Sequence, residues 1–292
     1  MQDIEGLLQD YRRDIDRYLE ELLEDQQIYS ELKEAMTYSL LSGGKRIRPI
    51  LTLLTCQLLE GNEGAARRVG AALEFIHTYS LIHDDLPAMD DDDFRRGQRS
   101  NHLVFGEGMA ILAGDALLTQ AFQLLVEVDL PAEKRCRLVN LIAESAGIQG
   151  MVAGQAMDLR AENRKIELEE LQQIHQKKTG ALFRAAILSG VLCSDYSREE
   201  WQALETYAEK LGLTFQIVDD LLDVVGNSLE LGKEVGQDLR RGKATYPALL
   251  GLEESRRRAE KAASQARESL AIFAERAGSL RELVDFVLER SS

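Results

Sequence analysis

Apolar side chains recur every three or four residues along most of this 292-residue chain. Near the N-terminus, an apolar stripe runs from Ile4 to Leu23 with the spacing of one face of an amphipathic helix. We find no convincing run in which apolar and polar residues alternate, which is the pattern of a half-buried strand. The periodicity therefore predicts an all-α protein. Its clearest further helices cover residues 63–85, 108–128, 199–225, 255–277 and 279–290.

Glycine and proline indicate where these helices begin and end. Pro87 lacks an N–H group and disfavours the α conformation of the residue before it, so the helix over residues 63–85 ends near this point. The Ser-Gly-Gly segment at residues 42–44 predicts a turn after an earlier helix, and the next helix can begin at Pro49. Residues 226–247 are rich in glycine and charge, which fits either a flap that closes over a site or a solvated loop.

Composition bounds the class of protein. The chain is 45% hydrophobic with only four prolines, so it can bury a sizeable core. No change in composition marks a linker and no repeat of fixed period occurs, so we expect one domain over residues 1–292. The formal net charge of -15 argues against a nucleic-acid partner, because such a partner requires a basic face.

Three cysteines and the apolar segments bear on the compartment. Cys56, Cys136 and Cys193 form no CxxC pair and are typical of buried apolar residues in a reducing compartment. The N-terminus lacks the basic and then apolar pattern of a signal peptide. Uncharged stretches such as residues 49–59 and 185–194 are shorter than the ~20 residues that a membrane helix requires. We therefore expect a cytoplasmic protein without a transmembrane segment.

Candidate chemistry is concentrated in residues 84–93, DDLPAMDDDD, which crowd six carboxylates at the predicted end of a helix. A helix C-terminus carries partial negative charge, so carboxylates are unfavourable there unless water or cations neutralise them. Carboxylate oxygens suit hard cations, and Mg²⁺ commonly binds one or two of them together with the phosphate oxygens of a substrate. A solvated acidic loop is the alternative, and this run alone does not decide between them.

A second acidic cluster, Asp219, Asp220 and Asp223, follows Gln216 near the end of the helix over residues 199–225. Asp219 and Asp223 share one helix face, where their charges repel, so their burial without a cation would be costly. Two such clusters fit one scheme, in which they meet at one end of a helical bundle and hold a diphosphate through Mg²⁺. Lys and Arg side chains would neutralise the remaining charge, and apolar helix faces would hold a hydrocarbon tail. Such a site promotes cleavage of a carbon–oxygen bond to diphosphate.

Basic side chains supply further candidates. Lys45, Arg46 and Arg48 follow a glycine pair just before a helix, which suits an anion and also fits a solvated basic turn. His77 precedes Asp84 by seven residues, about two helical turns, and so shares its face as either a ligand group or a structural histidine.

Two other polar groups interrupt apolar stretches. Gln155 and Asp158 stand close together in the sequence, and they either face a ligand or satisfy each other in the core. Residues 177–179 interrupt a long apolar helical face with two lysines and a threonine.

Seven segments in order carry a resemblance to the trans-isoprenyl diphosphate synthases, most closely to the bacterial farnesyl diphosphate synthases. Together they cover roughly residues 43–253. The resemblance implies an all-α isoprenoid synthase fold, a single-domain antiparallel helix bundle around a deep central cavity, and a homodimer. The segments are GGKRIRP, HTYSLIHDDLPAMDDDDFRRG, GQAMDL, HQKKTGAL, FQIVDDLLDVVG, LGK and KATYPALLGL.

The resemblance also implies a reaction. Isopentenyl diphosphate condenses with dimethylallyl or geranyl diphosphate to give (2E,6E)-farnesyl diphosphate by ionisation, condensation and elimination, with three Mg²⁺ ions at the site. No side chain need act as the base, because the released diphosphate can take the proton.

The resemblance assigns roles to residues that match the family motifs. Asp84, Asp90 and Asp219 are implied to bind Mg²⁺, and Asp84 and Asp219 thereby belong to the catalytic group with Lys178, Thr179 and Gln216. The implied roles of the others are as follows: metal support for Asp85, Asp220 and Asp223; the allylic diphosphate for Arg95, Lys178, Lys233 and Lys243; isopentenyl diphosphate for Lys45, Arg48, His77 and Arg96; and the reacting centre for Thr179 and Gln216. Asn227 and Asp91 depart from some relatives, and neither is an implied primary ligand.

Product length is implied to depend on Tyr79 and its neighbour Ser80. Tyr79 stands five residues before Asp84, ~7.5 Å along the helix axis, but the angular offset of about 140° does not by itself aim it into a cavity. In proteins similar to this one an aromatic residue at this position accompanies a C15 product. An ordinary core aromatic is the alternative interpretation.

Three other functions compete with farnesyl diphosphate synthesis. A geranylgeranyl diphosphate synthase would share every motif. A terpene cyclase also uses an aspartate cluster and Mg²⁺, but it has no second diphosphate substrate for the GGKRIRP turn and the second acidic cluster. A non-catalytic subunit of a heteromeric synthase would be expected to have lost acids from one cluster, whereas both are intact here.

Overall fold

The computed structural model describes residues 4–24, 27–162, 164–225 and 243–289. These ranges are helical apart from turns and one two-stranded hairpin, which confirms the predicted all-α fold. In chain order the elements are α1 (Ile4–Glu24), α2 (Ser30–Leu40), α3 (Ile47–Leu58), α4 (Glu63–Asp84), β1 (Phe94–Arg95), β2 (Gln98–Arg99), α5 (Asn101–Phe105), α6 (Glu107–Val126), α7 (Ala132–Ala146), α8 (Met151–Ala161), α9 (Leu168–His175), the π-helix η1 (Gln176–Gly180), α10 (Ala181–Leu192), α11 (Arg198–Val225), α14 (Tyr246–Leu250), α15 (Leu252–Ser269), the 3₁₀-helix η2 (Ala271–Ala277) and α16 (Gly278–Glu289).

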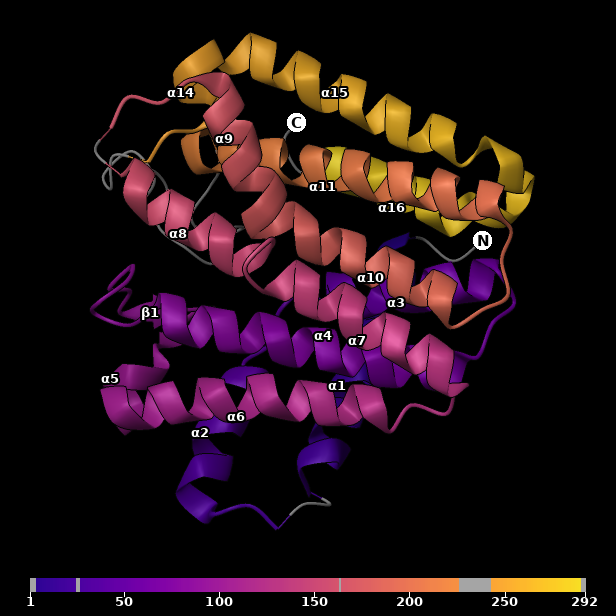
Figure 1. The fold of residues 1–292 in the computed structure, drawn as a ribbon. Coiled ribbons are helices and arrows are strands. Elements are labelled where there is room, and N and C mark those ends of the chain that lie inside the picture. The colour runs from indigo at the N-terminus through magenta and orange to yellow at the C-terminus, as the bar shows by residue number, and fades with distance from the viewer. Residues whose placement is uncertain (1–3, 25–26, 163, 226–242, 290–292) are drawn as a thin grey trace.

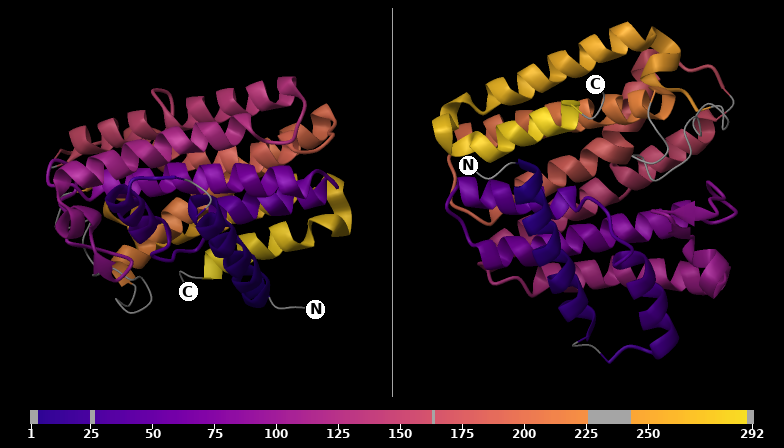
Figure 2. Two further views of the ribbon diagram at one scale, coloured as in Figure 1. Left: turned by 90° about the horizontal axis from the view of Figure 1, so that it is seen from below. Right: turned by 180° about the vertical axis from the view of Figure 1, so that it is seen from behind.

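The long helices lie side by side in a stack. α4 packs against α3 and α6, α10 packs against α3 and α11, and α11 packs against α15 (Figure 1). α1 and α2 run steeply across this stack on its other side (Figure 2). Fully buried apolar side chains from several of these helices form one continuous core, including Ile50, Phe75, Leu117 and Ile187.

Two helix boundaries show how the sequence sets the elements. α4 begins after Asn62, whose side chain accepts the Ala65 N–H at 2.9 Å, and it ends at Asp84, just before Pro87, as predicted. α3 begins at Ile47, two residues before the expected start at Pro49. Proline is tolerated at this position because the first N–H groups of a helix have no partner within the helix.

α6 is only partly buried. Ala113, Leu117 and Leu124 face the core, but Ile111 and Leu112 are 44% and 55% exposed. By length and composition alone, α6 is also apolar enough to cross a membrane. Because one face packs along α4, it is a helix of the bundle with an apolar outer stripe.

The prediction of three buried cysteines is wrong for one of them. Cys56 and Cys193 are buried, whereas Cys136 is exposed. Cys136 lies among charged residues on the solvent face of α7, and this local sequence, EKRCR, outweighs the general tendency of cysteine to be buried.

Candidate active site

The two acidic clusters meet in one cavity at one end of the bundle. Asp84 and Asp90, at the end of α4, and Asp219 and Asp220, on α11, line a space of about 200 Å³. α4 and α11 both end near this space, so the two clusters meet at one end of the bundle, as expected from the sequence. Lys178, Arg95 and Lys243 bring positive charge to the same walls.

A tight turn brings Asp84 and Asp90 together. After α4 the chain folds back so that the Asp90 N–H donates to the Asp84 carbonyl at 2.8 Å and the Asp91 N–H donates to the Leu86 carbonyl at 3.2 Å. Asp91 has a φ of 50°, a left-handed conformation that aspartate tolerates better than most residues. The turn that follows Pro87 thus places two carboxylates of the motif on one side of the cavity.

The donor set fits Mg²⁺ bound together with phosphate. Burial, opposed by the charge of Lys178, raises the pKa of Asp84 to about 6. Within the part of the chain that the structure describes, no three acidic, histidine or cysteine side chains are grouped closely enough to hold an ion by themselves. Mg²⁺ commonly takes one or two carboxylates and completes its shell with substrate phosphate and water, and the arrangement matches that preference.

A β-hairpin directs the two arginines that follow the first cluster. Its two-residue turn, Arg96-Gly97, has positive φ at both positions (54° and 78°), as a type I′ turn requires. Arg95 faces the cavity, whereas the Arg96 guanidinium donates to the Gly43 carbonyl. Gly44 has a φ of 124°, which residues with a Cβ rarely adopt, and a Cβ there would displace the Arg96 guanidinium, whose Cζ would lie 2.6 Å away.

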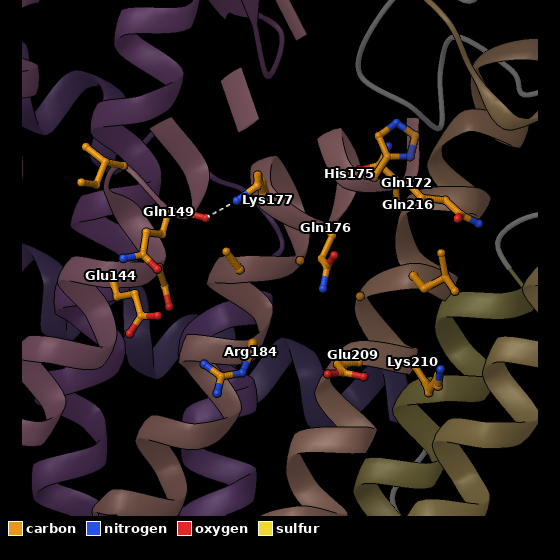
Figure 3. A pocket seen from close by; sticks show the side chains of 17 residues that line it. Glu144, Gln149, Gln172, His175, Gln176, Lys177, Arg184, Glu209, Lys210 and Gln216 are labelled. Carbon is orange, nitrogen blue, oxygen red and sulfur yellow. Dashed lines mark hydrogen bonds between the residues drawn. The ribbon is translucent and has the colours of Figure 1, made fainter. Parts of the chain in front are cut away.

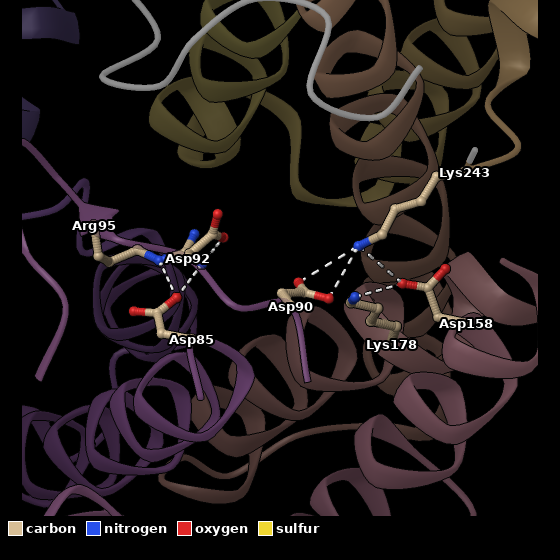
Figure 4. A network of polar contacts seen from close by, with 7 residues as sticks. All are labelled: Asp85, Asp90, Asp92, Arg95, Asp158, Lys178 and Lys243. Carbon is tan, nitrogen blue, oxygen red and sulfur yellow. Dashed lines mark hydrogen bonds and ion pairs between the residues drawn. The ribbon is translucent and has the colours of Figure 1, made fainter. Parts of the chain in front are cut away.

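Asp85 faces away from the cavity that Asp84 lines. Its side chain is 3% exposed, and Asp85 Oδ1 accepts a hydrogen bond from Arg95 Nε at 2.9 Å (Figure 4). Asp92 contacts the same guanidinium at 3.0 Å. This placement differs from the implied metal support and favours a role for Asp85 in orienting Arg95.

We expect Asp85→Asn to weaken the site through Arg95. Loss of a charged hydrogen-bond partner costs about 1.5–3 kcal/mol, so kcat/KM for the allylic substrate should fall about 10- to 100-fold. The Mg²⁺ concentration for half-maximal rate should stay near the wild-type value. Steady-state kinetics at varied Mg²⁺ test this, with Asp90→Asn as the contrasting variant that should raise the Mg²⁺ requirement. An Asp85→Asn enzyme that needs far more Mg²⁺ would show that Asp85 supports the metal.

The wall opposite the first cluster is a chain of hydrogen bonds. Thr179 Oγ1 donates to Gln216 Oε1 at 2.8 Å, and Gln216 Nε2 donates to Asp220 Oδ1 at 2.9 Å. Asp220 Oδ2 accepts the Tyr246 N–H at 2.9 Å. Asp220 is 3% exposed and therefore orients Gln216 and Thr179 toward the cavity. Asp223, in contrast, is not among the residues that line this space.

A π-helix presents Lys178 and Thr179. π-Helices are rare and are frequent at functional sites. α8 packs closely on η1, because a Cβ added at Gly154 would lie only 2.2 Å from the backbone nitrogen of Lys178. One turn further along α8, Asp158 Oδ2 accepts from Lys178 Nζ at 2.7 Å.

The structure decides between the two interpretations of Gln155 and Asp158. Asp158 lines the cavity. Gln155 is buried, and neither its amide oxygen nor its amide nitrogen has a hydrogen-bond partner in the described ranges, so the two residues do not satisfy each other. Sequence reasoning also left His175 unassigned, although it lines the cavity; burial lowers its pKa to about 4, so it is neutral at pH 7.

A second group of cations lies around His77 on α4. Burial, followed by the charges of Arg48 and Arg96, lowers the pKa of His77 well below its ordinary value, so His77 is neutral at pH 7. Burial lowers the pKa of Arg48 to about 10, and Arg48 remains charged. Its Nε has no hydrogen-bond partner in the described part of the chain, and its guanidinium lies 5.3 Å from the Phe183 ring centroid. These groups can receive an anion.

Arg46 is not part of a solvated or anion-binding turn. Its side chain is fully buried and donates to Asp16 Oδ1 at 2.7 Å, Glu74 Oε1 at 2.6 Å and the Leu40 carbonyl at 2.6 Å. Arg46 therefore ties α1, α2 and α4 together. Lys45 is exposed at the same turn, whereas Lys233 and Asn227 lie outside the described residues, as does most of the stretch over residues 226–247.

Tyr79 is buried on α4, with its ring edge-to-face against His83 at 5.6 Å. Burial and the charge of Asp84 raise the pKa of its hydroxyl to about 12. Ser80 is half-buried and donates to the His77 carbonyl at 2.8 Å. Neither residue lines the cavity between the acidic clusters, so their role in product length stays a prediction.

A larger cavity of about 640 Å³ lies on the other side of η1 (Figure 3). It shares His175 and Gln216 with the acidic cavity, but its other walls carry Glu144, Lys177 and Arg184. The aspartate clusters do not line it, and these charged walls are unsuited to a hydrocarbon tail. The acidic cavity, though smaller, therefore holds the candidate chemistry.

Comparison with known proteins agrees with this fold. A family model described as polyprenyl synthetase matches residues 29–280, so the chain belongs to the polyprenyl synthetase family.

Individual relatives show how far the similarity extends. The chain is 47% identical over 265 residues to a farnesyl diphosphate synthase of Escherichia coli, covering 88% of this chain and 89% of that protein. It is 42% identical over 288 residues to a farnesyl diphosphate synthase of Bacillus subtilis, covering 98% and 97%. The crystal structure of a geranyltransferase from Legionella pneumophila superimposes with a TM-score of 0.89 at 35% identity, covering 99% of this chain and 98% of that one.

Proposed function

We propose that this protein condenses isopentenyl diphosphate with dimethylallyl or geranyl diphosphate to form (2E,6E)-farnesyl diphosphate. The observation that carries the proposal is the meeting of the α4 and α11 acidic clusters in one cavity with Lys178 and Arg95. The similarity to farnesyl diphosphate synthases over nearly the whole chain supports the substrate class. The separate cations around His77 favour a second diphosphate substrate, which a terpene cyclase would not need.

The residues divide the reaction between them. Asp84, Asp90 and Asp219 would hold Mg²⁺, and we propose three ions per site. Bound Mg²⁺ supplies charge stabilisation to the leaving diphosphate. Lys178 and Arg95 bind the same diphosphate as it gains charge, and the oxygens of Thr179 and Gln216 face the allylic carbon as it becomes positive. Arg48, Arg96 and His77 orient isopentenyl diphosphate, and the released diphosphate takes the proton in the final elimination.

The direct test is product analysis. The purified protein is incubated with Mg²⁺, isopentenyl diphosphate and either dimethylallyl or geranyl diphosphate, and the prenyl alcohols are identified after phosphatase treatment. Farnesol as the main product supports the proposal. A cyclic hydrocarbon, or no product from either allylic substrate, would overturn it.

Mutations should separate the two substrate sites. Arg48→Gln should raise the KM for isopentenyl diphosphate by about tenfold or more, because a lost charge-assisted contact costs about 1.5–3 kcal/mol. Lys178→Gln should act on the allylic KM and on kcat, since its contact strengthens as the leaving group gains charge. Steady-state kinetics with each substrate varied in turn measure both effects. The assignment fails if Arg48→Gln leaves isopentenyl diphosphate saturation unchanged.

The proposal includes a homodimer in the cytoplasm. α6 carries an outer stripe with exposed Ile111, Leu112 and Val126, and apolar surface of this kind is typical of a subunit interface. A second copy of the chain that covers this stripe would also explain why an apolar helix faces outward.

Leu112→Asp should weaken this dimer. Burial of an unpaired carboxylate in an apolar interface has a high free-energy cost. The mass in solution should therefore fall toward that of one 32.7 kDa chain. Size-exclusion chromatography with light scattering measures the mass. Ile272→Asp is the matched control, because Ile272 on η2 is 55% exposed, as Leu112 is, and lies away from α6. Equal masses for the two variants would contradict the proposed interface.

A further inference from the structure

A lysine ammonium stands against the first acidic cluster. Lys243 Nζ lies 3.4 Å from both carboxylate oxygens of Asp90 and 3.6 Å from Asp158 Oδ2 (Figure 4). These side chains line the cavity that also contains Asp84 and Asp219. The Lys243 side chain is 12% exposed and that of Asp90 is 9% exposed. The ammonium therefore contacts both oxygens of the Asp90 carboxylate, the atoms through which a carboxylate binds a metal ion.

The backbone that follows Lys243 is fixed to the second acidic cluster. Thr245 caps α14 by accepting the Ala248 N–H at 3.3 Å, and the Tyr246 N–H donates to Asp220 at 2.9 Å. The Tyr246 side chain is fully buried. Since only two residues separate Lys243 from this anchor, α11 determines where its side chain begins. The backbone next to Lys243 is thus fixed to Asp220 of the second cluster, and the Lys243 ammonium contacts Asp90 of the first cluster.

Two cations cannot occupy this position together without strong repulsion, because like charges interact strongly at contact distance in a partly buried site. The ammonium has an alternative partner in Asp158, although Lys178 already binds that carboxylate at 2.7 Å. A bound diphosphate would offer a better partner, since charge-assisted hydrogen bonds to phosphate are strong.

We propose that Lys243 is the resident counter-ion of the first acidic cluster. It occupies the cation position at Asp90 while no diphosphate is bound, and it transfers to the diphosphate when the substrate arrives. Mg²⁺ would consequently bind Asp90 together with the diphosphate rather than before it. This order rests on the proposed function, whereas weak Mg²⁺ binding by the substrate-free protein does not require catalysis.

The test is calorimetric titration of MgCl₂ into the substrate-free protein. Lys243→Gln should bind Mg²⁺ about tenfold more tightly than the wild type, because the competing charge is gone. Lys177→Gln is the matched control: it removes a neighbouring lysine charge that does not line this cavity and whose ammonium donates to the Gln149 carbonyl at 2.8 Å, so it should change the affinity by only about twofold to threefold. Lys243→Arg keeps the charge and should bind Mg²⁺ as the wild type does. Cooperative thermal melting establishes that each variant is folded.

A second titration includes saturating inorganic diphosphate. The difference between Lys243→Gln and the wild type should then shrink, since the ammonium has left Asp90 in the wild type. The proposal is overturned if Lys243→Gln binds Mg²⁺ no more tightly than the wild type, or if Lys177→Gln gains as much affinity. A chain that shows the Mg²⁺ shifts but forms no prenyl product would refute the proposed function and leave this inference standing.

Discussion

Asp84→Ala and Asp219→Ala should each lower kcat/KM by at least about a thousandfold, and chelation of divalent cations should abolish turnover. The two carboxylates come from different helices and line one cavity of about 200 Å³. If Mg²⁺ bound to these carboxylates neutralises the leaving diphosphate, loss of either carboxylate removes stabilisation of the transition state, in which the diphosphate gains charge. Kinetics in Mg²⁺-buffered solution, with and without EDTA, measure the effect.

The matched control for this loss is Asp93→Asn. Asp93 belongs to the same acidic run but is exposed and does not line the cavity, so this variant should keep nearly wild-type activity. Near-normal turnover in EDTA would refute the metal scheme. Equal losses in Asp93→Asn and Asp84→Ala would indicate that overall acidity, rather than position, matters.

Helical period was sufficient to predict the all-α class, and the two acidic clusters were sufficient to predict that they meet at one end of the bundle. The reason is physical. An apolar helix face must be buried, and carboxylate clusters at the ends of buried helices must be neutralised by cations, which the two clusters can share. Asp84 and Asp219 do line one cavity. Helix boundaries such as the end of α4 before Pro87 followed from local backbone chemistry.

Side-chain direction within the clusters could not be predicted in the same way. Asp84 and Asp85 are adjacent in sequence, yet Asp84 lines the cavity, whereas Asp85 does not and instead accepts a hydrogen bond from Arg95. Arg46 and Arg48 share one basic turn, yet Arg46 is a buried structural ion pair. Such differences depend on neighbours distant in sequence, Glu74 for Arg46 and the hairpin for Asp85, which a local pattern does not contain.

Asp158 and His175 show the same limit. Each stands alone in its segment, and only the packing of α8 and η1 brings them to the cavity. The sequence left open whether Asp158 faces a ligand, and its contact with Lys178 in the structure places it at the cavity.

Tyr79→Ala should lengthen the product. The native enzyme is expected to release farnesyl diphosphate, and the variant geranylgeranyl diphosphate or longer chains. A large ring is a steric stop, and its removal leaves space that a further isoprene unit can fill; Tyr79 is buried against His83 on the helix that ends at Asp84. Chromatography of the dephosphorylated products measures the chain length. Replacement of a buried aromatic by alanine also costs about 3–5 kcal/mol of stability, so the assay is run well below the melting temperature of the variant.

Tyr79→Phe separates the ring from the hydroxyl. Burial and the charge of Asp84 raise the pKa of the Tyr79 hydroxyl to about 12, so it is neutral at the assay pH and its loss changes no charge near Asp84. If ring volume sets the length, Tyr79→Phe should still stop at C15 while Tyr79→Ala does not. A native C20 product, or an active Tyr79→Ala enzyme that still stops at C15, would show that another part of the cavity limits the chain. Both variants should keep their Mg²⁺ dependence, because neither touches the carboxylates that line the acidic cavity.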